Sequence, residues 1–458
     1  MTPMKTMHGI LPLVASTTDL LLDLVDANRH GYAVGLPSVC SANRFVLEAA
    51  VQQANRDETV VLIESTCNQV NQFGGYTGMR PADFRALVAD VAARQRYSLA
   101  GVIFGGDHLG PYPWRNEPAA RAMAKARDLV RAYVLAGYTK IHLDCSMRLA
   151  DDPGLVSDPL NDEMATTRTA ELATVAEKAW GELPAGQPAL LYVIGTEVPV
   201  PGGEQAAQAG PTISTAAHAQ RTYELCERAF ATAGLRDVWS RVVALVVQPG
   251  VEFGDDIVFD YRRTPTVLEL SSAIGRLPHL VYEAHSTDYQ TSAALRSLVK
   301  DHFAVLKVGP ALTFALREGL FALAAIEDEL FGRAPSGSAK VPPSHLRETV
   351  ERVMCEHPEH WQAYYSGEEA ALRLKRDFSY SDRIRYYWSQ ADVRDAIERL
   401  IANLSEHAIP STLLSQYLPD EARAARQRSL PAQPSPEELI RHKILTVLKD
   451  YAAACGMH

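Results

Sequence analysis

Residues 99–111, LAGVIFGGDHLGP, contain the pattern that decides the fold. An unbroken apolar run passes directly into the polar pair Asp107-His108, and a helix-period segment follows over Glu117–Ala136. Apolar runs without alternation are typical of strands that are covered on both faces. Because another such run, Thr139–Asp144, follows that helix, the stretch predicts two parallel strands joined by a helix.

The same alternation occurs eight times within about 300 residues, which predicts an α/β protein with a (β/α)8 TIM barrel. An open doubly wound sheet is the alternative, but it would bind its ligand at one switch point rather than beside many strand ends. The predicted strands are Tyr32–Val39, Thr59–Ser65, Leu99–Gly105, Thr139–Asp144, Ala189–Glu197, Arg241–Gln248, Leu280–His285 and Phe303–Val308.

The chain changes character after Gly332. A linker, APSGSAKVPPS, is followed by a helical, more charged region without strand runs. We therefore predict a barrel over residues 1–332, with a helix at Thr17–Asn28 that caps its bottom. A helical C-terminal appendage over residues 333–458 completes the chain, and it includes the aromatic and basic stretch Phe378–Trp388.

The composition excludes several classes of protein. Of the 458 residues, 47% are hydrophobic and 22% are charged, which is typical of a globular protein and not of a disordered one. The net charge of −10 argues against a nucleic-acid partner. Six scattered cysteines without a C-x-x-C pair argue against a disulfide scaffold or zinc ribbon. No apolar run is long enough for a membrane span and no leader pattern is evident, so we expect a cytoplasmic protein.

Polar side chains at the ends of several strands predict an active site, since barrel enzymes act at the C-terminal ends of their strands. Two imidazoles and a carboxylate, His108, Glu197 and His285, would suit a divalent metal, with Zn²⁺ the first choice. The alternative is that they are solvated loop residues or hydrogen-bonded core groups. His142, inside a strand, is predicted to be a core residue or to support a ligand.

Two carboxylates near this set are candidates for proton transfer. Asp107 precedes His108 and is placed to act as a general base on a sugar hydroxyl. Asp144 would orient it or take the reverse proton, the alternative being an ordinary helix-capping or loop carboxylate.

The end of the last strand, with its lysine, glycine and threonine, is typical of the phosphate site of such barrels. Two arginines of the appendage would reach a second phosphate, the alternative being a surface stripe that packs against tyrosines. The predicted substrate and phosphate ligands are Ser65, Gln248, Ser286, Lys307, Gly309, Thr313, Arg383 and Arg385.

The sequence has no G-x-x-x-x-G-K-[ST], no G-x-G-x-x-G after a strand and no G-x-S-x-G. A P-loop kinase, a dinucleotide enzyme and an α/β-hydrolase are therefore disfavoured.

At these motifs the chain resembles the class II, metal-dependent ketose-bisphosphate aldolases. The resemblance assigns an acid/base and a metal ligand to Asp107-His108, and it matches the family's E-x-x-x-x-G-G-E segment to Glu197–Glu204, with Glu204 a catalytic candidate. The family's metal histidine after strand six is replaced here by Gln248. Ordinary aldolase activity is therefore not expected.

The motifs FGGDHLGP, EVPVPGGE and SDRIRYYW resemble more specifically the branch called the non-catalytic, stabilising subunit of tagatose-bisphosphate aldolase, over nearly the full length. Some members of this branch are ketose-phosphate 4-epimerases. The resemblance implies an isomerase of carbohydrate catabolism that interconverts D-tagatose 6-phosphate and D-fructose 6-phosphate by metal-assisted retro-aldol chemistry. The alternative is a stabilising subunit bound to a class II aldolase, and an aldolase with altered metal ligation is weaker. A homo-oligomer is a further partner expectation.

Overall fold

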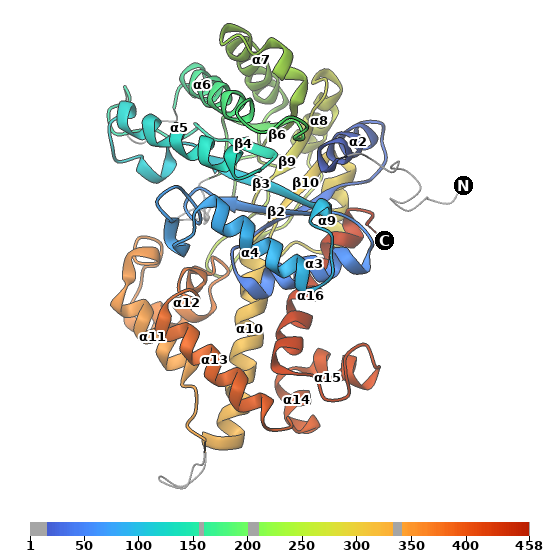
Figure 1. Cartoon of the computed structure of the whole chain (residues 1–458), viewed down its shortest axis with the longest axis vertical. Helices are drawn as coiled ribbons and strands as arrows, with labels where there is room; N and C mark the ends of the chain where they lie inside the picture. The colour runs from blue at the N-terminus through green and yellow to red at the C-terminus, as the bar shows by residue number, and fades with distance from the viewer. Residues whose placement is uncertain (1–15, 155–159, 200–209, 333–340, 458) are drawn as a thin grey trace, which may run out of the picture.

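The barrel predicted from the sequence is confirmed. The protein was analysed as a computed structural model, which describes residues 16–154, 160–199, 210–332 and 341–457. Eight parallel strands close in the order β1-β10-β9-β6-β5-β4-β3-β2 (Figure 1). Their bounds are β1 Leu36–Cys40, β2 Val61–Thr66, β3 Val102–Leu109, β4 Lys140–Leu143, β5 Leu191–Ile194, β6 Val242–Val246, β9 Val281–Ala284 and β10 Phe303–Val308.

A ring of helices covers the outside of the strands, because each helix buries its apolar stripe against the barrel. Each predicted strand overlaps an observed one, and Phe303–Val308 is observed with the predicted bounds. The strands β1, β2 and β3 end later than predicted, at Cys40, Thr66 and Leu109. The helices are α3 Arg44–Arg56, α4 Pro81–Arg94, α5 Ala119–Leu135, α6 Asp162–Trp180, α7 Ala216–Thr232, α8 Pro265–Ala273, α9 Ser292–Lys300 and α10 Pro310–Glu327.

A short antiparallel pair, β7 (Glu252–Phe253) with β8 (Val258–Phe259), follows β6 and was not predicted. Strands of two residues are too short to show a period of two in the sequence.

Helix α2 (Thr17–Arg29) lies against the N-terminal ends of the strands. The Asn28 amide donates to the carbonyls of Val34, which precedes β1, and Val299, at 2.8 and 3.0 Å. The Arg29 guanidinium donates to the carbonyl of Leu280, which precedes β9, at 2.5 Å. This helix therefore covers the end of the barrel opposite to the strand ends that hold Asp107 and His108.

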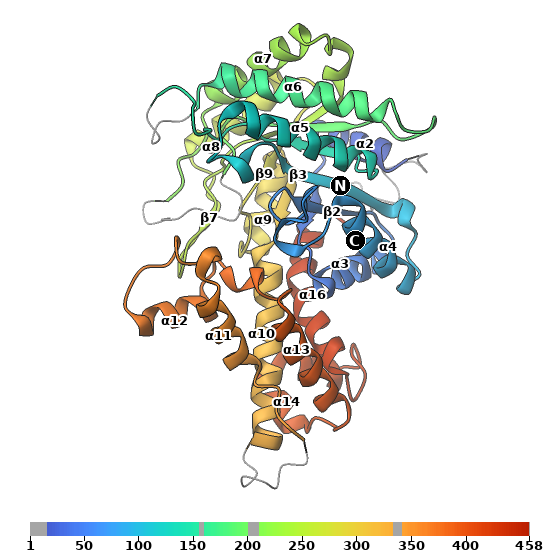
Figure 2. The ribbon, with the colours of Figure 1, turned by 60° about the vertical axis from the view of Figure 1, so that its left-hand side comes forward.

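The C-terminal helices form a lobe that is joined to the barrel by two long helices (Figure 2). Helix α10 runs from the barrel into the lobe, and α16 (Pro436–Ala454) returns to pack against α3, α9 and α10. Each of these two helices packs partly in the barrel and partly in the lobe. The predicted domain boundary near residue 332 therefore stays a prediction. The other helices of the lobe are α11 Leu346–Glu356, α12 Glu369–Phe378, α13 Ala391–Ser405, α14 Ser411–Tyr417 and α15 Pro419–Arg426.

No helix in the described ranges is both long and apolar enough to cross a membrane.

Candidate active site

A cluster of buried charges fills the barrel beneath the strand ends. The Lys140 ammonium lies 2.6 Å from Glu64 Oε1 and 2.7 Å from Glu283 Oε2, and all three side chains are almost completely buried. The Lys307 ammonium contacts Glu64 and lies 2.6 Å from Asp107 Oδ1 and 3.4 Å from Glu283 Oε1. Buried charges are tolerated only when they are paired, so this network of ion pairs holds Asp107 ionised at the top of the barrel.

Two glycines of the GGDHLGP stretch make room for this arrangement. A Cβ on Gly105 would lie 2.5 Å from Cγ of Glu64, so only glycine lets that side chain occupy the barrel interior. A Cβ on Gly110 would lie 1.8 Å from the carbonyl oxygen of Asp144. The glycines therefore permit close approach of the neighbouring strands.

The imidazole of His108 is held in one orientation by Asp144. Its Nδ1 lies 2.8 Å from Asp144 Oδ2, and Oδ1 of the same carboxylate accepts from the N–H and hydroxyl of Ser146 at 3.0 and 2.6 Å. His108 has a φ of +49°, in the left-handed region that non-glycine residues adopt at a cost. This pairing places the Nδ1 proton toward Asp144 and leaves Nε2 as a ligand atom.

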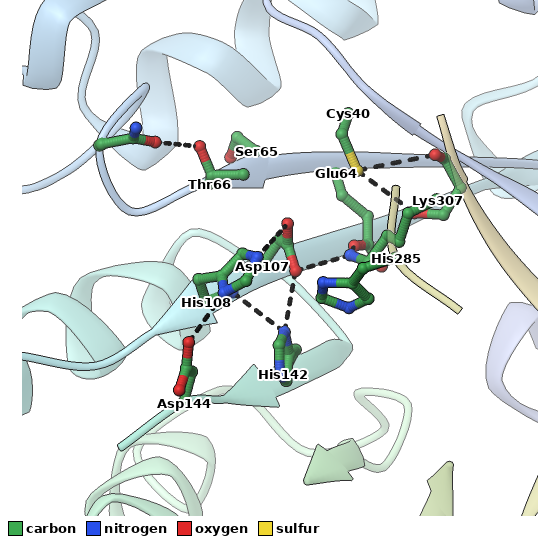
Figure 3. Close-up of polar contacts among 12 residues, drawn as sticks. Cys40, Glu64, Ser65, Thr66, Asp107, His108, His142, Asp144, His285 and Lys307 are labelled. Carbon is green, nitrogen blue, oxygen red and sulfur yellow. Dashed lines mark hydrogen bonds and ion pairs between the residues drawn. The ribbon is translucent and has the colours of Figure 1, made fainter. Parts of the chain in front are cut away.

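Two more histidines, His142 and His285, lie beside His108 (Figure 3), and each contacts a carboxylate. His142 Nδ1 is 2.8 Å from Asp107 Oδ1, and His285 Nε2 is 3.2 Å from Glu283 Oε1. Among the described residues, the buried Nε2 of His142 has no hydrogen-bond partner. An unpaired buried nitrogen is costly, and a bound cation would satisfy it.

Asp107, His108, His142 and His285 each offer a ligand atom, and these atoms all lie within 4.8 Å of one another. Three imidazoles and one carboxylate are a donor set that suits zinc or a related divalent ion. Carboxylates behind the imidazoles are the usual support of such ligands. The residues therefore fit a metal site, although the set differs from the predicted one.

Burial and neighbouring charges set the protonation of these groups. Burial lowers the pKa of His285 to about 3, which keeps its ring neutral and able to bind a metal. Burial also opposes the charged form of His108, but the carboxylates of Asp107 and Asp144 outweigh it and raise its pKa. Burial would raise the pKa of Asp107, yet His108, Lys307 and His142 hold it well below its usual value. A proton and a metal ion therefore compete for His108.

The cluster opens into a pocket that lies between the strand ends and the C-terminal lobe. Asp107, His108 and His285 form its floor, while Arg385 and Tyr386 of the lobe line its other side. The lobe thus completes the site that the barrel begins.

The structure does not bring three predicted residues into this site. Glu197 is 41% exposed at its side chain, accepts from Ser214 Oγ at 2.5 Å and does not belong to the histidine group. Ser65 lies on the outward face of β2, where its hydroxyl is 3.0 Å from that of Tyr133. Gln248 accepts the N–H groups of Gly250 and Val251 and does not line the pocket. Glu204 lies outside the described residues.

The predicted phosphate ligands are also divided. Ser286, Lys307, Gly309 and Arg385 line the pocket. In contrast, the Thr313 hydroxyl donates to Asp382 Oδ2 at 2.5 Å, and the buried Arg383 guanidinium stacks 3.2 Å from the ring of Tyr364, so neither lines it.

The sequence predicted His142 to be a core residue or to support a ligand, rather than to be a ligand itself, and it did not single out Asp288 at the pocket wall. The alternation of the KIHLD run puts His142 on the same face as Lys140 and Asp144, and this face turns out to be the barrel interior. That shared face was the sequence signal that could have placed His142 in the site.

Comparison with known proteins agrees with the resemblance seen in the sequence. The family model described as D-tagatose-1,6-bisphosphate aldolase subunit GatZ/KbaZ-like matches residues 21–456. The crystal structure of a probable tagatose 6-phosphate kinase from Sinorhizobium meliloti is 44% identical, with a TM-score of 0.81, over 92% of this chain and 100% of that one. The fructuronate-tagaturonate epimerase of Cohnella laeviribosi is 12% identical, with a TM-score of 0.47, over 99% of this chain and 90% of that one.

Proposed function

The chain belongs to the family of GatZ/KbaZ-like D-tagatose-1,6-bisphosphate aldolase subunits, and we propose that it is a ketose-phosphate 4-epimerase that interconverts D-tagatose 6-phosphate and D-fructose 6-phosphate. The observation that carries the proposal is the buried group of Asp107, His108, His142 and His285, of which Asp107, His108 and His285 line the floor of a pocket. A subunit that only stabilised a partner would have no use for an unpaired buried imidazole nitrogen beside an ionised carboxylate.

The chemistry follows from the substrate. The hydrogen on C4 is β to the C2 ketone and is not acidic, so direct proton removal does not invert C4. Cleavage of the C3–C4 bond avoids that difficulty, because the bonding electrons pass into the C2 ketone and C4 becomes an aldehyde. When the aldehyde turns over and C3 attacks its other face, the epimer forms.

Asp107 is suited to the proton transfers of this route. Its carboxylate takes the proton of the C4 hydroxyl as the C3–C4 bond breaks and returns it to the new C4 oxygen as the bond re-forms. Lys307 and His142, both in contact with Oδ1, keep the carboxylate ionised before each transfer. The wall formed by Arg385 and Tyr386 keeps the two fragments together.

His108, His142 and His285 would hold a divalent metal, whose chemistry is Lewis-acid stabilisation of negative charge on the substrate's oxygens. His108 would be oriented for this by Asp144, and His285 by Glu283.

The test uses the purified chain, alone and loaded with zinc or manganese, with D-tagatose 6-phosphate deuterated at C4. We expect D-fructose 6-phosphate that retains the deuterium at C4, and an Asp107→Asn variant that is slower by at least about 100-fold. Loss of the label to solvent would overturn the mechanism.

The second candidate is a subunit that stabilises a class II aldolase, as the family description suggests. It is favoured by Gln248, which stands where the resemblance places a metal histidine. If the chain has no epimerase activity with any divalent metal, and if it raises the melting temperature of an added class II aldolase, this second function would replace the epimerase proposal.

A further inference from the structure

Asp288 occupies the place where a phosphate is expected in a barrel of this kind. Its Oδ1 accepts the N–H of Gly309 at 2.9 Å and the N–H of Ala311 at 2.8 Å, which are amides at the start of α10. The residue is only 2% exposed, and it lines the pocket beside His285 and Ser286.

Backbone N–H groups at the start of a helix that follows the last barrel strand are suited to bind phosphate. Here these donors are already satisfied by a side chain of the same protein. Burial raises the pKa of Asp288 to about 6, while the N–H groups of Ala311 and Gly309 oppose that rise. The carboxylate is therefore ionised at neutral pH, and a phosphate at the same amides would meet both a competitor and a like charge.

The pocket also lacks spare positive charge for a second phosphate. Among its described lining residues, the basic side chains other than histidine are Lys307 and Arg385. The Lys307 ammonium lies among three carboxylates. Arg385 donates to the Asp382 carbonyl at 2.9 Å and to the Tyr386 hydroxyl at 3.1 Å.

We propose that Asp288 is a specificity-determining residue that excludes a phosphate from the part of the pocket next to His285 and Ser286. In the proposed mechanism the C2 carbonyl faces the histidine cluster, so the C1 substituent bonded to it is the one that would approach Asp288. The substrate class is then a ketose with an uncharged hydroxymethyl group at C1 and its phosphate at the other end, not a 1,6-bisphosphate. This inference rests on the proposed epimerase function and names the residue that sets its specificity at C1.

The experiment compares D-tagatose 6-phosphate with D-tagatose 1,6-bisphosphate in the wild type, in Asp288→Ala and in Asp288→Asn. We expect the wild type to favour the monophosphate in kcat/KM by about 100-fold, because a phosphate at C1 would meet the like charge of Asp288. Both variants should lose most of this preference, through tighter binding of the bisphosphate. Asp83→Asn is the matched control, since Asp83 accepts the Arg80 N–H at the start of α4 outside the pocket.

Titration calorimetry with inorganic phosphate and with the bisphosphate separates this inference from the proposed function. If the chain turns over no ketose, the epimerase proposal fails, but Asp288→Ala should still bind phosphate more tightly than the wild type does. If the alanine variant does not fold, the asparagine variant decides, because it keeps the shape and removes only the charge. Equal affinity of the wild type for both ketoses, or no gain of phosphate binding in a folded variant, overturns the role of Asp288.

Discussion

His108 Nδ1 and Asp144 Oδ2 lie 2.8 Å apart, although 36 residues separate them in the chain. The pair joins the ends of β3 and β4, and the His108 ring that it holds lies 5.0 Å from the ring of His142 and 4.9 Å from the ring of His285, between ring centroids. Orientation of a ligand by a carboxylate behind it is a common device of metal sites. The first prediction follows from this contact.

Replacement of Asp144 by asparagine should weaken zinc affinity by about 10–100-fold, because the imidazole of His108 loses the charged partner that orients it. Competition with a chelating dye measures the affinity. Asp90→Asn is the control, since Asp90 pairs with Arg94 on the exposed surface. Unchanged affinity in the Asp144 variant would contradict the proposed role.

His142 and Glu197 distinguish the ligand set of the structure from the one predicted from the sequence. His142→Ala should remove tightly bound zinc, because it deletes a buried member of the histidine group. Glu197→Gln should leave the zinc content unchanged, because Glu197 is exposed and pairs with Ser214. Metal analysis of the purified variants measures their zinc content. Loss of zinc in the Glu197 variant but not in the His142 variant would favour the ligand set predicted from the sequence, His108, Glu197 and His285.

Lys307→Met should destabilise the fold strongly, by roughly 3–5 kcal/mol, since it leaves buried carboxylates without their cation. The double variant with Glu64→Gln should recover part of this loss, because it also removes one of the uncompensated charges. Denaturant unfolding of the wild type, both single variants and the double variant gives the coupling. Simple additivity of the two losses would rule out the charge explanation.

Asp382 should make stability depend on pH. Burial raises its pKa to about 7, with Arg385 and the Thr313 hydroxyl opposing the rise. A folded pKa above the ordinary 3.8 means that the folded state holds the proton more tightly, so stability is lost as pH rises from about 4 to about 7. Asp382→Asn mimics the protonated form and should escape this loss.

The stability advantage of Asp382→Asn over the wild type should therefore grow between pH 5 and pH 7, at most by roughly 1.4 kcal/mol for each pH unit, and then level off. Melting temperatures of both proteins across pH 5–8 measure it. An advantage that does not change with pH would show that Asp382 is already ionised throughout this range.

Local pattern was sufficient for most of the fold and for part of the site. Phe303–Val308 was predicted with its observed bounds because an unbroken apolar run is decided by burial on both faces. Asp107-His108 was found because the polar end of an apolar strand is visible in the sequence. The two-residue strands β7 and β8 were missed, because strands this short leave no periodic signal.

The sequence by itself determined that strands and helices alternate eight times, and that carboxylates and imidazoles stand where strands end. Only the tertiary structure decided which of these groups meet. Closure of the barrel directs His142 inward and leaves Glu197 exposed, and the packing of two loops places the Asp288 carboxylate on the amides of α10. The physical reason is that secondary structure depends on neighbours along the chain. The pairing of buried charges depends on neighbours in space, which the register and curvature of the whole barrel set.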